Sequence, residues 1–170
     1  NPDTMYLSAS IDADGVYRIR GRALDTTEWR TSERGRTNSR APRVVIFQTT
    51  TATVGQTGEL AEMSNCRNQT LDSIDQFELE LDDEGRFEII VAARRPRDYE
   101  GHLLLSRAEA PCPSTFGTTT YRMRDATGLN VREIFSNWDD EIPLELEIVR
   151  LDMRGAPRPP RNSAGMGLDL

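Results

Sequence analysis

The stretch NWDDEIP, residues 137–143, places three carboxylates side by side, on Asp139, Asp140 and Glu141. Carboxylates can catalyse hydrolysis when two of them face one cavity, about 5–9 Å apart in glycoside hydrolysis. A hydrolase or lyase of this kind would also draw on the preceding segment, where an arginine could hold an anionic substrate. The candidates for such a catalytic site are Asp139, Asp140, Glu133 and Arg132.

The same stretch fits a corner between two β-strands, and the sequence favours this interpretation over catalysis or metal binding. Successive side chains of a strand point to opposite faces, so Asp139 and Asp140 would not share a target there. In a turn, Asn137 or Asp139 can accept hydrogen bonds from backbone N–H groups, and Trp138 can cover the edge of the fold. Arg132 could then pair with the carboxylates.

The chain has one histidine, His102, which would have to serve as the base of any Ser–His–acid triad. It begins the strand-like segment HLLLSR, and no GxSxG motif accompanies it. A single histidine at a strand start is more often a surface or hydrogen-bonded residue than a base. The sequence also lacks GxGxxG, Walker and HExxH motifs, so no cofactor is predicted.

Two acidic turns, DADG at 12–15 and DDEG at 82–85, resemble pieces of a calcium-binding loop. An EF-hand spreads its ligands over a longer loop that ends in a glutamate, and neither turn does so. The two cysteines, Cys66 and Cys112, lack the Cys/His spacing of a zinc site. No metal site is predicted, and the sequence leaves open whether the cysteines pair.

Charge and hydropathy limit the classes of function. The formal net charge of −7 argues against a dedicated nucleic-acid binder, although the segment 18–43 is rich in arginine. The chain is free of lysine, which indicates the codon bias of a GC-rich genome. No apolar run approaches the ~20 residues of a membrane span, so no membrane contact is expected. A cytoplasmic location is slightly favoured, and export stays open because a signal segment could precede this stretch.

Alternation of apolar and polar residues predicts β-strands almost throughout the chain. The two acidic turns lie between alternating or β-branched segments, and this pattern predicts two hairpins. The predicted strands are 6–11, 16–23, 43–50, 77–81, 86–91, 102–107, 118–124, 129–137 and 144–152. Short strands separated by turns predict an all-β fold, an antiparallel, jelly-roll-like β-sandwich.

Two segments without a clear period, 25–42 and 51–75, are predicted to be long loops, and the first is interpreted as an insertion. The one helix candidate is the short segment 58–65. The sandwich domain is predicted to span residues 1–153, and a Pro/Gly-rich tail or linker follows at 154–170. Because the chain begins inside a strand-like segment and ends in this tail, it is interpreted as a fragment of a longer protein.

The motifs near both ends resemble an uncharacterised bacterial family, catalogued as domain of unknown function 1214. The matching residues are Asn1, Pro2, Asp3, Tyr6, Tyr17, Arg18, Ile19, Gly21, Gly85, Phe87, Arg132, Phe135, Trp138, Asp139 and Pro143. The resemblance implies a jelly-roll-like sandwich toward the C-terminal end of a longer protein, behind a helical region or a companion sandwich domain. It supplies no catalytic residue. The chain departs from the family at GHLLLS and in the segment 25–42.

Three functions are compatible with these observations. The first is a non-catalytic module that binds a small-molecule or carbohydrate-like ligand, or packs against a companion domain. Its candidate ligand contacts are Trp138, Trp29, Tyr99 and His102. The second is the carboxylate-based hydrolase or lyase, and the third is a jelly roll that self-assembles into a homo-oligomer. The sequence does not decide whether the chain is an enzyme.

Overall fold

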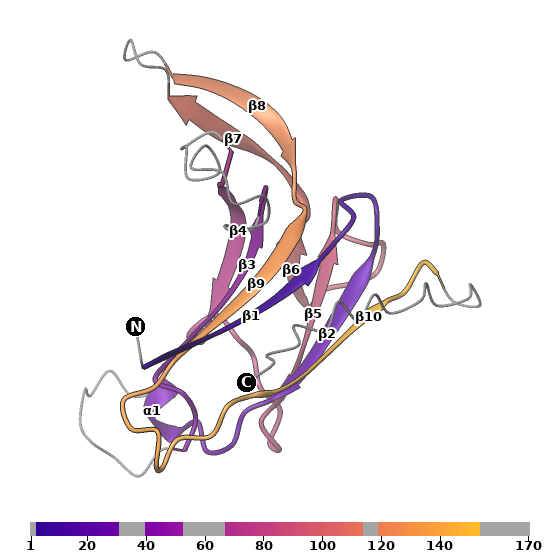
Figure 1. The fold of residues 1–170 in the computed structure, drawn as a ribbon. Coiled ribbons are helices and arrows are strands. Elements are labelled where there is room, and N and C mark those ends of the chain that lie inside the picture. Colours follow the sequence, from indigo (N-terminus) through magenta and orange to yellow (C-terminus); the bar gives the residue numbers. More distant parts are fainter. Residues whose placement is uncertain (1–2, 31–39, 53–66, 114–118, 154–170) are drawn as a thin grey trace, which may run out of the picture.

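The computed structural model describes residues 3–30, 40–52, 67–113 and 119–153, which fold into strands and one short helix (Figure 1). The elements are β1 (Thr4–Ser10), β2 (Tyr17–Arg22), α1 (Thr27–Arg30), β3 (Val44–Thr50), β4 (Thr70–Asp75), β5 (Arg86–Ala92), β6 (His102–Leu105), β7 (Arg107–Pro113), β8 (Thr119–Asp125), β9 (Gly128–Ile134) and β10 (Glu145–Arg150). The prediction of an all-β fold is confirmed. No helix in this part of the chain is long and apolar enough to cross a bilayer.

Two four-stranded sheets face each other as the layers of a sandwich (Figure 1). The first sheet has the strand order β1-β9-β3-β4 and the second the order β10-β2-β5-β6. Neighbouring strands of these sheets run antiparallel, as predicted, except for β5 and β6, which are parallel. The first two strands of the chain therefore pair with the last two, because β1 adds to β9 and β2 adds to β10.

The core lies between the two sheets and is filled by the side chains that alternate inward. On β3, Val45, Phe47 and Thr49 are buried, and β5 contributes Phe87 and Ile89 from the opposite sheet. The rings of Phe47 and Phe87 meet edge to face across the core, with centroids 5.6 Å apart. This contact joins the two layers near the centre of the sandwich.

The first acidic turn, 12–15, connects the two sheets instead of closing a hairpin. The N–H of Gly15 donates to the carbonyl of Asp12 at 2.9 Å, and the N–H of Asp12 donates to the Tyr17 hydroxyl at 2.8 Å. The turn is tight, but β1 and β2 belong to different sheets, so the predicted hairpin is wrong. An Asp/Gly turn specifies that the chain reverses and does not specify which strands pair.

The second predicted hairpin is also wrong, because the segment 77–81 does not form a strand. The Asp75 carboxylate ends β4 by accepting a hydrogen bond from the N–H of Phe77 at 2.8 Å. Further along, the N–H of Glu80 donates to Nε2 of His102 at 2.8 Å. Since side chains bind these backbone donors, the segment does not pair with β5.

Both predicted loops contain regular structure. The segment 25–42, interpreted as an insertion, includes α1, and its Trp29 and Ala41 are buried in the core. The segment 51–75 ends in β4, which pairs with β3. The helix candidate 58–65 and most of the segments 51–69 and 31–40 lie outside the described residues, as does the tail 154–170.

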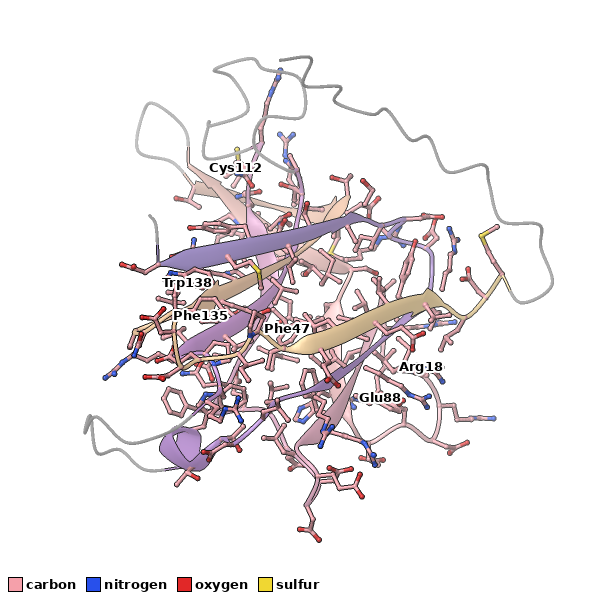
Figure 2. The ribbon with its side chains drawn as sticks, turned by 60° about the horizontal axis from the view of Figure 1, so that its bottom comes forward. Arg18, Phe47, Glu88, Cys112, Phe135 and Trp138 are labelled. Carbon is pink, nitrogen blue, oxygen red and sulfur yellow. The ribbon has the colours of Figure 1, made fainter. Side chains whose placement is uncertain are left out.

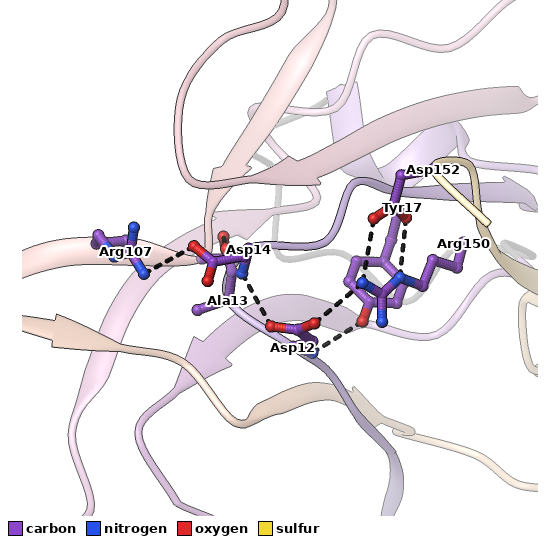
Figure 3. Close-up of polar contacts among 8 residues, drawn as sticks. Asp12, Ala13, Asp14, Tyr17, Arg107, Arg150 and Asp152 are labelled. Atoms are coloured by element: carbon purple, nitrogen blue, oxygen red, sulfur yellow. Dashed lines mark hydrogen bonds and ion pairs between the residues drawn. The ribbon is translucent and has the colours of Figure 1, made fainter.

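The strands β7 and β8 pair with each other and form a two-stranded ribbon, here called the arm, which extends beyond both sheets (Figure 1). At its base, Arg107 binds Asp125 at 2.5 Å and Asp14 at 2.9 Å. Arg150 binds Asp12 at 3.0 Å from the other side (Figure 3). These ion pairs connect the arm, the turn between β1 and β2, and the end of β10.

Candidate functional site

The acidic stretch NWDDEIP, residues 137–143, forms a corner, as the sequence predicts. Residues 138–140 form a turn between β9 of the first sheet and β10 of the second. Asn137 organises this turn: its Oδ1 accepts the N–H of Asp139 at 3.1 Å, and its carbonyl accepts the N–H of Glu141 at 3.0 Å. Its side-chain amide also donates to the carboxylate of Asp140. The three carboxylates lie at the surface of the corner and stabilise or border the turn.

Glu133 differs from the corner carboxylates because its side chain is fully buried. Oε2 accepts a hydrogen bond from the N–H of Leu144 at 3.0 Å, and Oε1 has no hydrogen-bond partner among the described residues. Burial raises the pKa of the Glu133 carboxyl, and the bond from Leu144 opposes this rise only in part. Glu133 is a carboxyl group held inside the sandwich.

Arg132 does not hold an anion together with these carboxylates. It follows the alternation of β9 and is exposed on the face opposite to Glu133. Its guanidinium lies 5.3 Å from the centre of the Tyr6 ring, and it forms no ion pair with any described residue. Asp139 and Asp140 are exposed on the turn while Glu133 is enclosed, so the structure does not bring these groups to a common pocket.

The two tryptophans proposed as ligand contacts occupy different environments. Trp138 stacks on Phe135 with ring centroids 4.0 Å apart and is 46% exposed, so one ring face is covered by the protein (Figure 2). Trp29 is buried in the core, and its indole N–H donates to the carbonyl of Pro42 at 2.9 Å. Trp29 therefore anchors the segment after α1. Of the two tryptophans, only Trp138 presents an aromatic surface to solvent.

Tyr99 lies near the end of the connection between β5 and β6, and His102 is the first residue of β6. Burial raises the pKa of the Tyr99 hydroxyl, and the carboxylate of Glu88 raises it further. The loop is held by Arg95, which donates to the carbonyls of Tyr99 at 3.1 Å and Gly101 at 2.7 Å. His102 accepts the Glu80 N–H described above. Both residues have structural contacts in this loop.

The described residues contain no group of three His, Cys, Asp or Glu side chains that could hold a metal ion. A cleft of about 750 Å³ between the end of β2 and the turn 82–85 is lined by several acidic residues. Asp82 in this cleft accepts the N–H groups of Glu84 at 2.9 Å and Arg86 at 2.8 Å, and the bond from Arg86 lowers the pKa of its carboxyl. Its carboxylate is thus used to close the turn.

Cys112 lies on β7 of the arm and is disulfide-bonded. The other cysteine of the chain, Cys66, lies outside the described residues.

A groove that the sequence did not suggest opens between the two sheets, at the edge where β1 and β10 lie opposite each other. It has a volume of about 200 Å³. Most of its lining is apolar: Leu7, Ala9, Leu129, Val131, Leu146 and Ile148. Leu7 and Ile148 are 38% and 39% exposed, so the apolar interior of the sandwich reaches the surface here. The alternating apolar residues of two edge strands are the signal that could have indicated it.

Comparisons with known proteins establish the fold and no function. No family model matches the chain, and no curated protein matches it. A crystal structure of an uncharacterized protein from Burkholderia cenocepacia is similar, with a TM-score of 0.59 and 22% sequence identity. The match covers 94% of this chain and 32% of that protein, so the chain spans about a third of its length. At this identity the similarity shows a shared fold alone.

Proposed function

We propose that this chain is a non-catalytic β-sandwich module that binds an apolar partner surface in the groove between β1 and β10. The observation that carries the proposal is the groove itself: an opening lined by side chains of both sheets, with Leu7 and Ile148 partly exposed at its mouth. Transfer of apolar surface out of water is favourable, so a partner that covers this surface would gain binding free energy from it.

The arrangement of the carboxylates supports a non-catalytic role. Glu133, with its raised pKa, is the one observation in favour of a carboxylate-based hydrolase or lyase. Such an enzyme needs a second carboxylate and a substrate path to the first one. Glu133 is fully enclosed, and Asp139 and Asp140 are exposed on the outer turn.

The proposal includes a companion domain in a longer chain, as the resemblance to the family of unknown function implies. The length of the Burkholderia protein, of which this chain spans 32%, supports a fold that occurs within larger proteins. Module-to-module contact is a common use of exposed apolar edges. A small-molecule or carbohydrate-like ligand is the alternative partner, with Trp138, which does not line the groove, as the exposed aromatic candidate contact.

The groove can be tested with 1-anilinonaphthalene-8-sulfonate, a dye whose fluorescence increases on apolar surfaces. At low protein concentration we expect the folded wild type to bind the dye and Ala9→Phe, which fills the groove, to bind much less. Phe77→Ser is the matched control, because Phe77 is 69% exposed and does not line the groove. Equal dye binding by the wild type and Ala9→Phe would refute the proposal.

A further inference from the structure

We propose that the chain self-associates head to tail, with β8 of one copy adding to the free edge of β10 in the next copy. This inference rests on the proposed function, because it names the occupant of the groove between β1 and β10. The sheet β10-β2-β5-β6 would gain β8 of the second copy as a fifth strand, followed by that copy's β7.

Both strands have an unused edge. Among the described residues, β8 pairs with β7 alone and β10 pairs with β2 alone. The unpaired side of such a strand carries a row of backbone N–H and C=O groups that can accept another strand. The arm that carries β8 stands clear of the sandwich, and β10 lies well apart from it (Figure 1). The two edges of one copy therefore do not satisfy each other.

The side chains of the two edges are complementary in charge. On β8, Arg122 and Arg124 alternate with Tyr121 and Met123. Neither Arg122 nor Arg124 forms an ion pair within the described part of the chain. A two-stranded ribbon with such an exposed outer strand has little stability of its own in water, and a partner would stabilise it.

On β10, Glu145 and Glu147 alternate with Leu146 and Ile148. Neither glutamate forms an ion pair with another residue that the structure describes. Leu146 and Ile148 line the groove, and Glu147 also borders it. By the alternation of the strand, Glu145 and Glu147 lie on the outer face of the sheet, opposite Arg22 and Arg20 of β2.

One antiparallel register matches four consecutive positions of β8, residues 121–124, with complementary positions of β10. It sets Arg122 opposite Glu147 of the second copy and Arg124 opposite Glu145, so both acid–base pairs lie on the outer face. The same register sets Tyr121 opposite Ile148 and Met123 opposite Leu146, on the face of the groove. Opposite charges and apolar pairs at facing positions are the interactions that stabilise neighbouring strands.

The same contact would cover much of the exposed apolar surface. Tyr121 and Met123 are 63% and 62% exposed, and Leu7 and Ile148 at the groove mouth are 38% and 39% exposed. Eight large hydrophobic side chains are exposed among the described residues, and these are four of them. The second copy's Tyr121 and Met123 would extend the apolar layer of β10 over the mouth of the groove.

Symmetric pairing of like edges is disfavoured. Pairing β8 with β8 places arginines opposite arginines, and pairing β10 with β10 places glutamates opposite glutamates, which destabilises a strand pair. The unlike edges therefore pair, and the contact is heterologous. Such contacts generate rings or open chains of copies instead of a closed twofold dimer.

The test measures mass by sedimentation or light scattering over a wide range of protein concentration, for the wild type and for two charge-reversed variants. We expect the mass of the wild type to rise with concentration, and to rise less at high salt. Arg122→Glu/Arg124→Glu and Glu145→Arg/Glu147→Arg should each weaken association about tenfold or more. An equimolar mixture of the two variants should associate again, since each reversed edge then meets its complement.

Arg94→Glu/Arg97→Glu is the matched control for Arg122→Glu/Arg124→Glu, because it makes the same change in net charge at exposed positions of the loop between β5 and β6. Thermal unfolding verifies that each variant folds. A wild type that stays monomeric, a control that dissociates as much as the edge variants, or a mixture that does not recover would each overturn the inference. If the monomer still binds the dye in an Ala9-dependent manner, the proposed function survives; if it does not, both fail.

Discussion

Oε2 of Glu133 accepts a hydrogen bond of 3.0 Å from the backbone N–H of Leu144, the residue directly before β10. This bond joins the last inward side chain of β9 to the start of the strand in the opposite sheet. The other carboxyl oxygen is buried and has no hydrogen-bond partner in the part of the chain that the structure describes, and burial raises the pKa of the group. The corner is therefore closed from the inside by a carboxyl group whose protonated form is favoured by burial.

Replacement of Glu133 by Gln should stabilise the protein at neutral pH and remove a pH dependence. A carboxyl whose pKa is higher in the folded than in the unfolded state contributes stability at acidic pH. That stability is lost as the pH rises through the folded-state pKa. The difference in unfolding free energy between Glu133→Gln and wild type should accordingly grow from acidic to neutral pH, as measured by denaturant titration at several pH values.

Glu109→Gln, at an exposed glutamate of β7, is the control for the general effect of removing a negative charge. A pH-independent difference between Glu133→Gln and the wild type would contradict the burial argument. Glu133→Ala should be destabilising by about 1–3 kcal/mol at acidic pH, because it leaves the Leu144 N–H without an acceptor, and this cost should fall toward neutral pH.

At the surface of the corner, we expect Asn137 to matter more than its acidic neighbour. Asn137→Ala removes the acceptor of one N–H and the donor to Asp140, and should cost about 1 kcal/mol. Asp139→Ala should change the free energy of unfolding by less than about 0.5 kcal/mol, since its carboxylate accepts no hydrogen bond from the described residues. Chemical denaturation of both variants decides this, and a larger cost at Asp139 would reverse the assignment.

The corner and the sandwich could be predicted because both depend on local patterns. Alternation in VVIFQTT and the apolar run of RFEIIVA are enough to place β3 and β5 in strands. Asn137 and the acidic residues after it are typical turn residues, and the chain turns there. These features need no knowledge of which strands become neighbours.

Pairing and burial could not be predicted, because they depend on residues far apart in the sequence. The segment 77–81 alternates like a strand, yet Asp75 and His102 bind its backbone and leave it outside both sheets. The segment TLDSID has few apolar residues and is predicted to be part of a loop, yet it forms β4 by pairing with β3. Glu133 is a surface type of residue that the β9 alternation turns inward.

Gly85 should not tolerate a side chain. It adopts φ of 75°, and a Cβ at this position would lie 2.2 Å from the carbonyl oxygen of Ala23. Backbone atoms cannot move aside as a flexible side chain can, so Gly85→Ala should cost more than about 1 kcal/mol in unfolding free energy. Asp83→Ala in the same turn is exposed and serves as the control, with an expected change within about 0.5 kcal/mol.

The anchorage of the arm can be followed by hydrogen exchange. Arg107→Gln removes the pairs to Asp125 and Asp14, which hold the base of the arm at a partly exposed site. Amide exchange in β7 and β8 should accelerate about threefold, while the core of β3 should exchange as before. Arg122→Gln on the same arm is the control; equal acceleration by both variants would show that Arg107 does not hold the arm.

The two tryptophans should respond differently to the same substitution. Trp29→Phe leaves the buried carbonyl of Pro42 without its donor and should cost about 1–3 kcal/mol. Trp138→Phe retains an aromatic ring on Phe135 at a half-exposed site and should cost less than about 0.5 kcal/mol. Denaturant titration compares the two, and similar costs would mean that Trp29 is less enclosed than the structure indicates.

The pairing of β1 with β9 and of β2 with β10 has a consequence for biosynthesis. A ribosome adds about 5–20 residues per second, so β1 waits on the order of ten seconds before its partner strand exists. β2 finds β5 sooner but lacks its other neighbour until the end. Throughout this time the nascent chain exposes unpaired, partly apolar strands, and sheet formation depends on contacts of long sequence separation. Folding of this domain is therefore a late event, and the emerging chain is a natural client for chaperones that shield extended segments.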